Sequence, residues 1–373
     1  MEDKIFSFVP RLEKQDISEV TEAVSTGWGE NREFYIRSLE ESLRSITNRK
    51  FALAVSHGSD AIHLSLSALG LEPGDEIIVP DLTWVACVSP IIHLGLTPVF
   101  VNVDESMCMD PNSFNRAITT RTKAVIVVDL AGSLPNWDEI LKVAKQHNIL
   151  IIEDAAESLG GNYKENPAGS FGDVSILSFS GTKVVTGGHG GAVITNSEQI
   201  YNKMKLLYHH GIDQELTGKY YWSTEAGYNF QLSNIQAALI NSQLSRLSKL
   251  VDFKRNLYNS YREELNRINS IELISPMNNV NSSFWLIVAI INPKLGLSKE
   301  EVIFKARQFG VDIRPFFYLL STMPPFVGYR VEVEENRLLT ERLSNFGICL
   351  PYGYDMTDSK VKKVVNVLKK ILV

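Results

Sequence analysis

Short apolar stretches alternate with amphipathic ones over the first two-thirds of the chain. The apolar stretches are rich in β-branched residues, which is typical of strands buried in a parallel sheet. The amphipathic stretches repeat their apolar positions with a helical period. This alternation predicts an α/β domain with a mostly parallel sheet. The predicted strands span residues 76–79, 97–101, 124–128, 150–153, 174–178 and 192–195, and the predicted helices 59–69, 84–94, 136–146 and 198–209.

The last third of the chain predicts a smaller second unit. A continuous helical pattern runs from Ser233 to about Leu265 and connects the two parts. Beyond it, we expect fewer strands and an α+β arrangement. We therefore expect a large domain at residues 1–245 and a small C-terminal domain at 246–373. The small domain should contain strand 284–291, helix 299–309, strand 311–314 and a last helix at 358–372.

The composition is ordinary for a soluble globular enzyme, and the sequence lacks the features of several other classes. The chain has 373 residues, of which 44% are hydrophobic and 21% charged, with a net charge of -6. The chain has no basic cluster with interleaved aromatics of the kind that predicts nucleic-acid binding. It also has no apolar run as long as a membrane span. The N-terminus lacks the features of a signal peptide. The histidines and cysteines lack metal-ligand spacing, so we expect no metal site, reduced thiols and a cytoplasmic location.

Two stretches about thirty residues apart carry the candidate chemistry. The apolar run 149–152 ends in acids that include Asp154 and Glu157, and Lys183 precedes a glycine-rich loop. A lysine amine can condense with the aldehyde of pyridoxal phosphate (PLP), and a carboxylate can pair with the pyridinium nitrogen. Alone, such a lysine is usually solvated, and such an acid often only caps a helix. Together, the two stretches predict a PLP site with Lys183 as its catalytic residue.

Three further segments have residues suited to binding a phosphorylated ring. Gly58 and Ser59 open a predicted helix, whose free backbone N–H groups favour a phosphate. Ser178 closes a predicted strand, and its hydroxyl could reach the same phosphate. Trp84 follows another strand, where an aromatic side chain can stack on a planar ring. The alternative interpretations are a plain helix cap for Gly58 and Ser59, and a core or interface position for Trp84.

Several sequence blocks resemble the DegT/StrS family of PLP-dependent nucleotide-sugar aminotransferases over nearly the whole chain. They occur in the family's order at Gly27-Trp28, 70–80, 97–104, 153–160, 227–238, 314–318 and 323–325. The resemblance implies an aspartate-aminotransferase-like fold (fold type I), with active sites shared between two subunits of a homodimer. It implies that Lys183 bonds to the cofactor, that Asp154 pairs with the pyridine nitrogen and that Glu157 faces the ring oxygen. Gly58, Ser59 and Ser178 would hold the phosphate, Trp84 would stack on the ring, and Asn229 would reach the phosphate from the other subunit.

The resemblance also implies a reaction. An amino group would move from L-glutamate to a nucleotide-linked keto sugar, such as GDP-4-keto-6-deoxymannose, for a surface polysaccharide. The residues that would contact the substrates are Trp28, Gln231, Arg314, Tyr318 and Ser321. Gln231 replaces an arginine of relatives, Ser321 a histidine and His189 a glutamate, and Ser56–Ser59 and Val128–Gly132 also depart from the family's sequence. Asp129, Gln231 and Ser321 are expected where the sugar nucleotide or the donor carboxylate binds.

Two alternatives to this activity remain open. The acceptor could be a 3-keto sugar, a cyclitol ketone or a keto group on a longer sugar acid. The chain could also bind PLP or a sugar nucleotide without catalysis, as a sensor. Lys183 itself argues against the family's dehydratases, which carry histidine at this position.

Overall fold

The computed structural model describes residues 4–213, 217–266, 268–333 and 337–372. Its centre is an eight-stranded sheet in the order β1-β9-β8-β5-β4-β2-β3-β14. Neighbours from β8 to β14 pair in parallel, and β9 pairs antiparallel with both β1 and β8. The strands are β1 (Phe51–Val55), β2 (Glu76–Pro80), β3 (Thr97–Val101), β4 (Thr122–Val128), β5 (Leu150–Asp154), β8 (Val174–Ser178), β9 (Gly191–Thr195) and β14 (Arg330–Val331).

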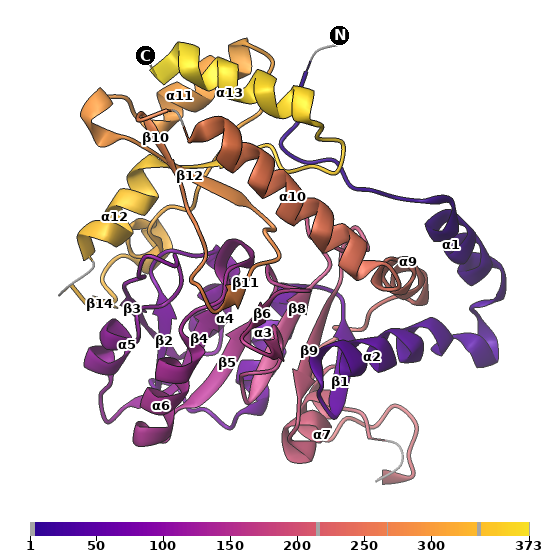
Figure 1. Cartoon of the computed structure of the whole chain (residues 1–373). Coiled ribbons are helices and arrows are strands. Elements are labelled where there is room, and N and C mark those ends of the chain that lie inside the picture. The colour runs from indigo at the N-terminus through magenta and orange to yellow at the C-terminus, as the bar shows by residue number, and fades with distance from the viewer. Residues whose placement is uncertain (1–3, 214–216, 267, 334–336, 373) are drawn as a thin grey trace.

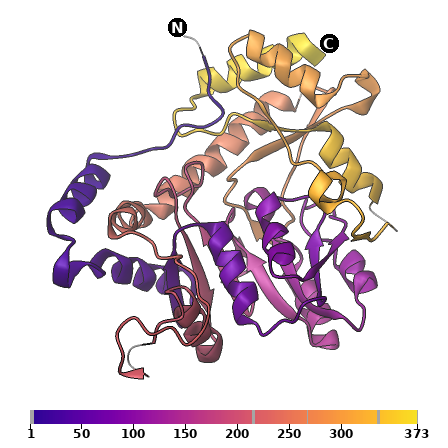
Figure 2. The ribbon, with the colours of Figure 1, turned by 180° about the vertical axis from the view of Figure 1, so that it is seen from behind.

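Helices cover this sheet, as the two opposite views show (Figures 1 and 2). They bury apolar side chains such as Leu39, Leu64 and Ile140, and such burial is the dominant favourable contribution to folding. The helices of this part are α1 (Lys14–Thr26), α2 (Phe34–Thr47), α3 (Gly58–Ala68), α4 (Ser89–His93), α5 (Pro111–Ala117), α6 (Trp137–His147), α7 (Glu198–Leu207) and α9 (Asn234–Leu244).

The C-terminal part forms an antiparallel sheet in the order β10-β12-β15-β13. In Figure 1 it lies above the central sheet, in orange and yellow, with α10 running between the two parts. Its strands are β10 (Ile271–Leu273), β12 (Ile287–Ile291), β13 (Arg314–Pro315) and β15 (Gly347–Leu350). Its helices are α10 (Leu247–Leu265), α11 (Lys299–Gln308), α12 (Arg337–Phe346) and α13 (Asp358–Leu372).

Several short pairings connect the two parts of the chain, among them the bridge between Leu82 and Leu319. β14 adds to the edge of the central sheet beside β3, although it comes from the C-terminal half. β11 (Val280–Asn281) pairs with β6 (Asn162–Tyr163), which also pairs with β7 (Asn166–Pro167). Ile5, near the N-terminus, forms a bridge with Val311. A domain boundary at residue 245 stays a prediction.

The structure confirms the six predicted strands of the central sheet and corrects several other elements. The helical pattern at 233–265 is two helices, because Arg246 leaves the helical conformation with φ -122°. Predicted helix 84–94 consists of a 3₁₀ turn (Val85–Cys87) and α4, with a proline in the first turn of α4. Proline lacks the backbone N–H that would continue the first segment. In predicted strand 284–291, Phe284 has φ +48°, so the strand starts only at Ile287.

Predicted strand 311–314 is displaced toward the C-terminus. Val311 pairs with Ile5, and the strand that joins the second sheet is β13, Arg314–Pro315. Among the described residues, no helix is both long and apolar enough to cross a membrane.

Candidate active site

The carboxyl ends of β1, β2, β4, β5 and β8 lie at one edge of the central sheet. Their parallel directions require this arrangement, since β1 and β8 are both antiparallel to β9. Asp154 ends β5 and Ser178 ends β8. The loop 179–190 follows β8 and carries Lys183 back toward the same edge. Ligands in open α/β sheets bind at such an edge.

The Lys183 amine lies in a largely buried position between an acid and an aromatic ring. Its Nζ is 3.6 Å from Glu157 Oε1 and 3.6 Å from the ring centre of Trp285. Only 12% of the Lys183 side chain is exposed. Burial lowers the pKa of Lys183 below its ordinary value, although the nearby carboxylates of Glu157 and Asp154 raise it. A lysine with a lowered pKa can act as a nucleophile and as a base.

Glu157 is held by a backbone donor at Oε2, the carboxylate oxygen that is not paired with Lys183. The N–H of Ala131 donates to Glu157 Oε2 at 2.7 Å. Ala131 has a left-handed conformation (φ +59°), which is strained for a residue with a side chain. Burial raises the pKa of Glu157 to about 7, with Lys183 acting in the opposite direction. Near neutral pH, Glu157 can therefore either hold a proton or accept one.

Asp154 is a buried acid with a partner on each oxygen. Oδ1 accepts from the backbone N–H of Ala156 at 3.0 Å, and the Cys87 thiol donates to Oδ2 at 3.1 Å. Burial raises the pKa of Asp154, and the bond from Cys87 lowers it. The acid is thus fixed in orientation, as pairing with a ring nitrogen requires.

The structure brings Gly58 and Ser178 into direct contact at the start of α3. A Cβ on Gly58 would lie 3.0 Å from Ser178 Cβ and 3.2 Å from Ser178 Oγ. Gly58, Ser59 and Ser178 form a cradle. The close approach of its parts requires a glycine at position 58, which has no side chain. The cradle combines a serine hydroxyl with the free N–H groups and positive end of a helix. These residues fit a phosphate, and Lys183, Glu157 and Asp154 fit an aldehyde-bearing ring with a basic nitrogen.

Trp84 lies in the loop after β2, with 56% of the residue exposed. Its ring centre is 6.2 Å from that of Phe317, which comes from the C-terminal part. The same loop is fastened to that part through Asp81, whose carboxylate accepts from Ser321 N and Oγ at 2.7 Å each. Arg337 pairs with the same carboxylate at 2.6 Å. Ser321 therefore holds the Trp84 loop in place through Asp81.

The other predicted substrate residues have their own partners in the described chain. Arg314 pairs with Asp312 at 3.0 Å, and the Tyr318 hydroxyl donates to Glu300 at 2.8 Å. Gln231 bridges to Val55 beside the cradle and hydrogen-bonds Tyr208. Trp28 is 64% exposed, and its indole donates to Val24 O. Asn229 is exposed and pairs with His209. The roles of these residues toward a substrate, and the role of Asn229 toward the cofactor phosphate, stay predictions.

The expectation for Asp129 is wrong. Its side chain is fully buried and accepts from Ser158 Oγ at 2.7 Å, so it does not line an open substrate site. Burial keeps the pKa of Asp129 well above its usual value. Sequence analysis also missed Cys87 and Trp285 as neighbours of Asp154 and Lys183. Both contacts join residues distant along the chain, and no local sequence pattern indicates them.

Comparisons with known proteins agree with this arrangement. The model of the DegT/DnrJ/EryC1/StrS aminotransferase family matches residues 10–369. GDP-perosamine synthase of Caulobacter vibrioides is 32% identical over 366 residues, which cover 98% of this chain and 97% of the relative. The structure of DesI with its TDP-sugar product is 26% identical, with a TM-score of 0.90, and covers 100% of this chain and 94% of DesI. Spr1654 of Streptococcus pneumoniae in its PLP form is 25% identical, with a TM-score of 0.89 and full coverage of both chains.

Proposed function

The chain belongs to the DegT/DnrJ/EryC1/StrS aminotransferase family, and we propose that it transfers an amino group from L-glutamate to a nucleotide-linked keto sugar. PLP is the cofactor. The acceptor that best fits the relatives is a 4-keto-6-deoxyhexose such as GDP-4-keto-6-deoxymannose, because the similar proteins include GDP-perosamine synthases. The observation that carries the proposal is the amine of Lys183 between Glu157 and Trp285, at the sheet edge that Asp154 also reaches.

The proposed reaction exchanges an amino group for a keto oxygen. L-glutamate loses its amino group and leaves as 2-oxoglutarate, and the keto carbon of the sugar gains that group. When bound, PLP supplies the aldehyde that accepts the amino group and a ring that takes up electrons from the reacting carbon. The cradle of Gly58, Ser59 and Ser178 would hold the phosphate, and Trp84 would cover one ring face.

Lys183, Asp154 and Glu157 would each hold or move a proton at a different position in this reaction. Lys183 Nζ is placed to act as the base that would take a proton from the carbon bearing the amino group and deliver it across the nitrogen to the carbon of the former aldehyde. The Asp154 carboxylate, fixed by Ala156 and Cys87, would pair with the protonated ring nitrogen. Glu157, whose Oε1 lies 3.6 Å from the Lys183 amine, would face the ring oxygen. The closeness of Glu157 favours the protonated amine after each transfer.

We further propose a cytoplasmic homodimer with shared active sites. Asn229 and Gln231 follow an exposed loop that includes Tyr220, Tyr221 and Trp222. An exposed aromatic cluster of this kind is typical of a protein interface. Asn229 would then reach the phosphate of the partner's cofactor, as the resemblance to the family implies.

A panel of keto-sugar nucleotides tests the reaction. The purified protein, loaded with PLP, is incubated with glutamate and each candidate, and formation of 2-oxoglutarate and the amino sugar is measured. We expect turnover with a GDP- or TDP-linked 4-keto-6-deoxyhexose. Turnover only with a 3-keto sugar or a cyclitol ketone would overturn the proposed acceptor. A cofactor that never passes to its pyridoxamine form with glutamate would overturn the aminotransferase activity.

A further inference from the structure

Trp285 packs its indole ring directly against the Lys183 amine. The ring centre lies 3.6 Å from Nζ, and Trp285 is only 7% exposed. A cation above the face of an indole is attracted by the electrons of the ring, and the attraction is stronger where water is excluded. Trp285 lies just ahead of β12, whereas Lys183 lies in the loop after β8.

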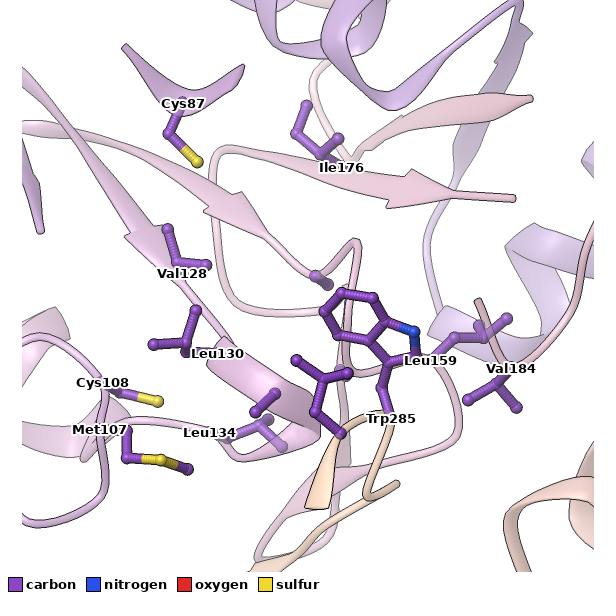
Figure 3. Packing of buried hydrophobic residues seen from close by; sticks show 14 of the residues in the cluster. Cys87, Met107, Cys108, Val128, Leu130, Leu134, Leu159, Ile176, Val184 and Trp285 are labelled. Atoms are coloured by element: carbon purple, nitrogen blue, oxygen red, sulfur yellow. The ribbon is translucent and has the colours of Figure 1, made fainter. Parts of the chain in front are cut away.

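The Trp285 ring is fixed from several sides. Its Nε1 donates to the carbonyl of Thr182, the residue before Lys183, at 2.7 Å. The Tyr352 ring meets it edge-on with 6.3 Å between the ring centres. In Figure 3, the indole lies among the apolar side chains of Leu159 and Val184. The ring therefore has a defined orientation, and both its face and its N–H contact the lysine loop.

The same segment also supports Glu157, the other neighbour of the lysine amine. Ser282 Oγ donates to Gly132 O at 2.7 Å, and Leu286 N donates to Ala131 O at 3.2 Å. Ala131 in turn donates to Glu157. Segment 282–286 thus fastens both neighbours of the Lys183 amine, Trp285 directly and Glu157 through the 131–132 turn.

Three ionisable groups act on the Lys183 amine besides the indole. Glu157 lies 3.6 Å away, and Asp154 and the Cys87 thiol act over longer distances. Burial opposes the charged form of the amine, and Glu157 and Asp154 favour it. The indole is a neutral group, so it favours the ammonium without adding a charge that must itself be balanced.

We propose that Trp285 is a positioning residue that holds the ammonium of Lys183 over its indole face whenever this amine is not bonded to the cofactor. The ring keeps the released lysine close to Glu157 and away from solvent. The proposal rests on the proposed role of Lys183 in transamination, but its test requires no turnover.

The test measures the protonation of Lys183 in protein loaded with pyridoxamine phosphate, in which the lysine amine is free. A small amine-reactive reagent is applied over a range of pH, and mass spectrometry gives the rate of modification of Lys183. A trifluorinated tryptophan, incorporated only at position 285, keeps the shape and the N–H but weakens the attraction of the ring face. We expect the midpoint pH to fall by about 0.4 to 1.5 units, because cation–π attraction contributes about 0.5–2 kcal/mol and one unit corresponds to about 1.4 kcal/mol.

Two comparisons separate this role from simple packing. Trp137 is also buried, but it stacks on Phe171 with ring centres 4.7 Å apart, and the same fluorination there should leave the midpoint unchanged. If Trp285 only fills space, the fluorinated ring should leave the midpoint unchanged. In that case only Trp285→Leu should shift the midpoint, and it should raise it, because the smaller side chain opens the site to water. An unchanged or raised midpoint with the fluorinated ring would overturn the proposal. A protein that shows the expected fall but fails with every keto sugar would overturn only the proposed acceptor.

Discussion

Cys87 donates its thiol proton to Asp154, with Sγ 3.1 Å from Oδ2. The two residues are 67 positions apart, and the cysteine is fully buried. Figure 3 shows Cys87 in the apolar cluster near Ile176 and Val128. The acid that would pair with the ring nitrogen is thus held by a neutral thiol.

Removal of this thiol should mainly change the pKa of Asp154. Cys87→Ala removes the bond that lowers the pKa of Asp154, so burial should raise this pKa further. We expect turnover to fall by roughly three- to tenfold, since a hydrogen bond contributes about 0.5–1.5 kcal/mol. Steady-state kinetics measure the effect, and Cys108→Ala, also buried, is the matched control. Equal losses in both variants would show that Cys87 acts only through packing.

The negative charge of Asp154 should contribute more to turnover than its hydrogen bond from Cys87. Asp154→Asn keeps the size of the side chain but removes the negative charge opposite the ring nitrogen. We expect turnover to fall by about 10²–10³-fold, as for the loss of one preorganised electrostatic group. Single-turnover measurements with saturating glutamate isolate this step from binding. Turnover close to that of the wild type would refute the pairing with the ring nitrogen.

Variants of the phosphate cradle should lose affinity for PLP, which has a phosphate, but not for pyridoxal, which has none. Ser178→Ala should weaken PLP binding by roughly 10- to 100-fold, since a hydrogen bond to a charged group contributes about 1.5–3 kcal/mol. Gly58→Ala should weaken it at least as much, because its Cβ would lie 3.0 Å from Ser178 Cβ. Absorbance titration gives both affinities. Pyridoxal, which lacks the phosphate, is the control ligand, and an equal loss for both ligands would contradict the proposed cradle.

Asp16 and Arg246 should stabilise the fold at neutral pH. Asp16 is fully buried in α1, and Arg246 Nη1 donates to its Oδ1 at 2.8 Å. Burial raises the pKa of Asp16, but the bonds from Arg246, Glu13 and Ser242 outweigh it, and the net pKa is lowered. Asp16→Asn leaves the buried arginine with only Glu13, 3.8 Å from its Nε, as an ionic partner, so the free energy of unfolding should fall by about 3 kcal/mol.

The sign of the pKa shift fixes how this difference depends on pH. A lowered carboxyl pKa adds stability above the unfolded value near 4, and this stability is lost as the pH falls through the folded pKa. Chemical denaturation should therefore show a large difference at pH 7 that shrinks below about pH 4. Asp138→Asn is the control, because its pair with Lys164 is exposed and should contribute far less to stability. A difference that grows toward acid pH would contradict this account.

Local sequence patterns predicted the parts of the fold that depend on periodicity. Buried parallel strands such as β4 and β5 have continuous apolar residues, and their positions follow directly from this feature. The break between α9 and α10 could not be predicted in this way. There Arg246 leaves the helix and pairs with Asp16, which is 230 positions away. The turn at Phe284 likewise depends on its packing against Tyr258, with ring centres 4.0 Å apart.

The candidate site was predictable only where its chemistry is local. Lys183 and Asp154 have informative neighbours in the sequence, and the structure places both at one edge of the sheet. Trp285 and Cys87 look like ordinary core residues, and only the fold brings them to the reactive groups. Asp129 shows the opposite error, since an acid that follows a strand can turn into the core and bond to Ser158.

The central claim is that the amine of Lys183 bonds to the PLP aldehyde. The most direct test is the visible absorption spectrum of purified Lys183→Ala after addition of PLP, beside the wild type. We expect the variant to lack the band of the protein-bound cofactor and to have no measurable turnover with glutamate. A variant that keeps both the band and the turnover would show that Lys183 does not bond to PLP.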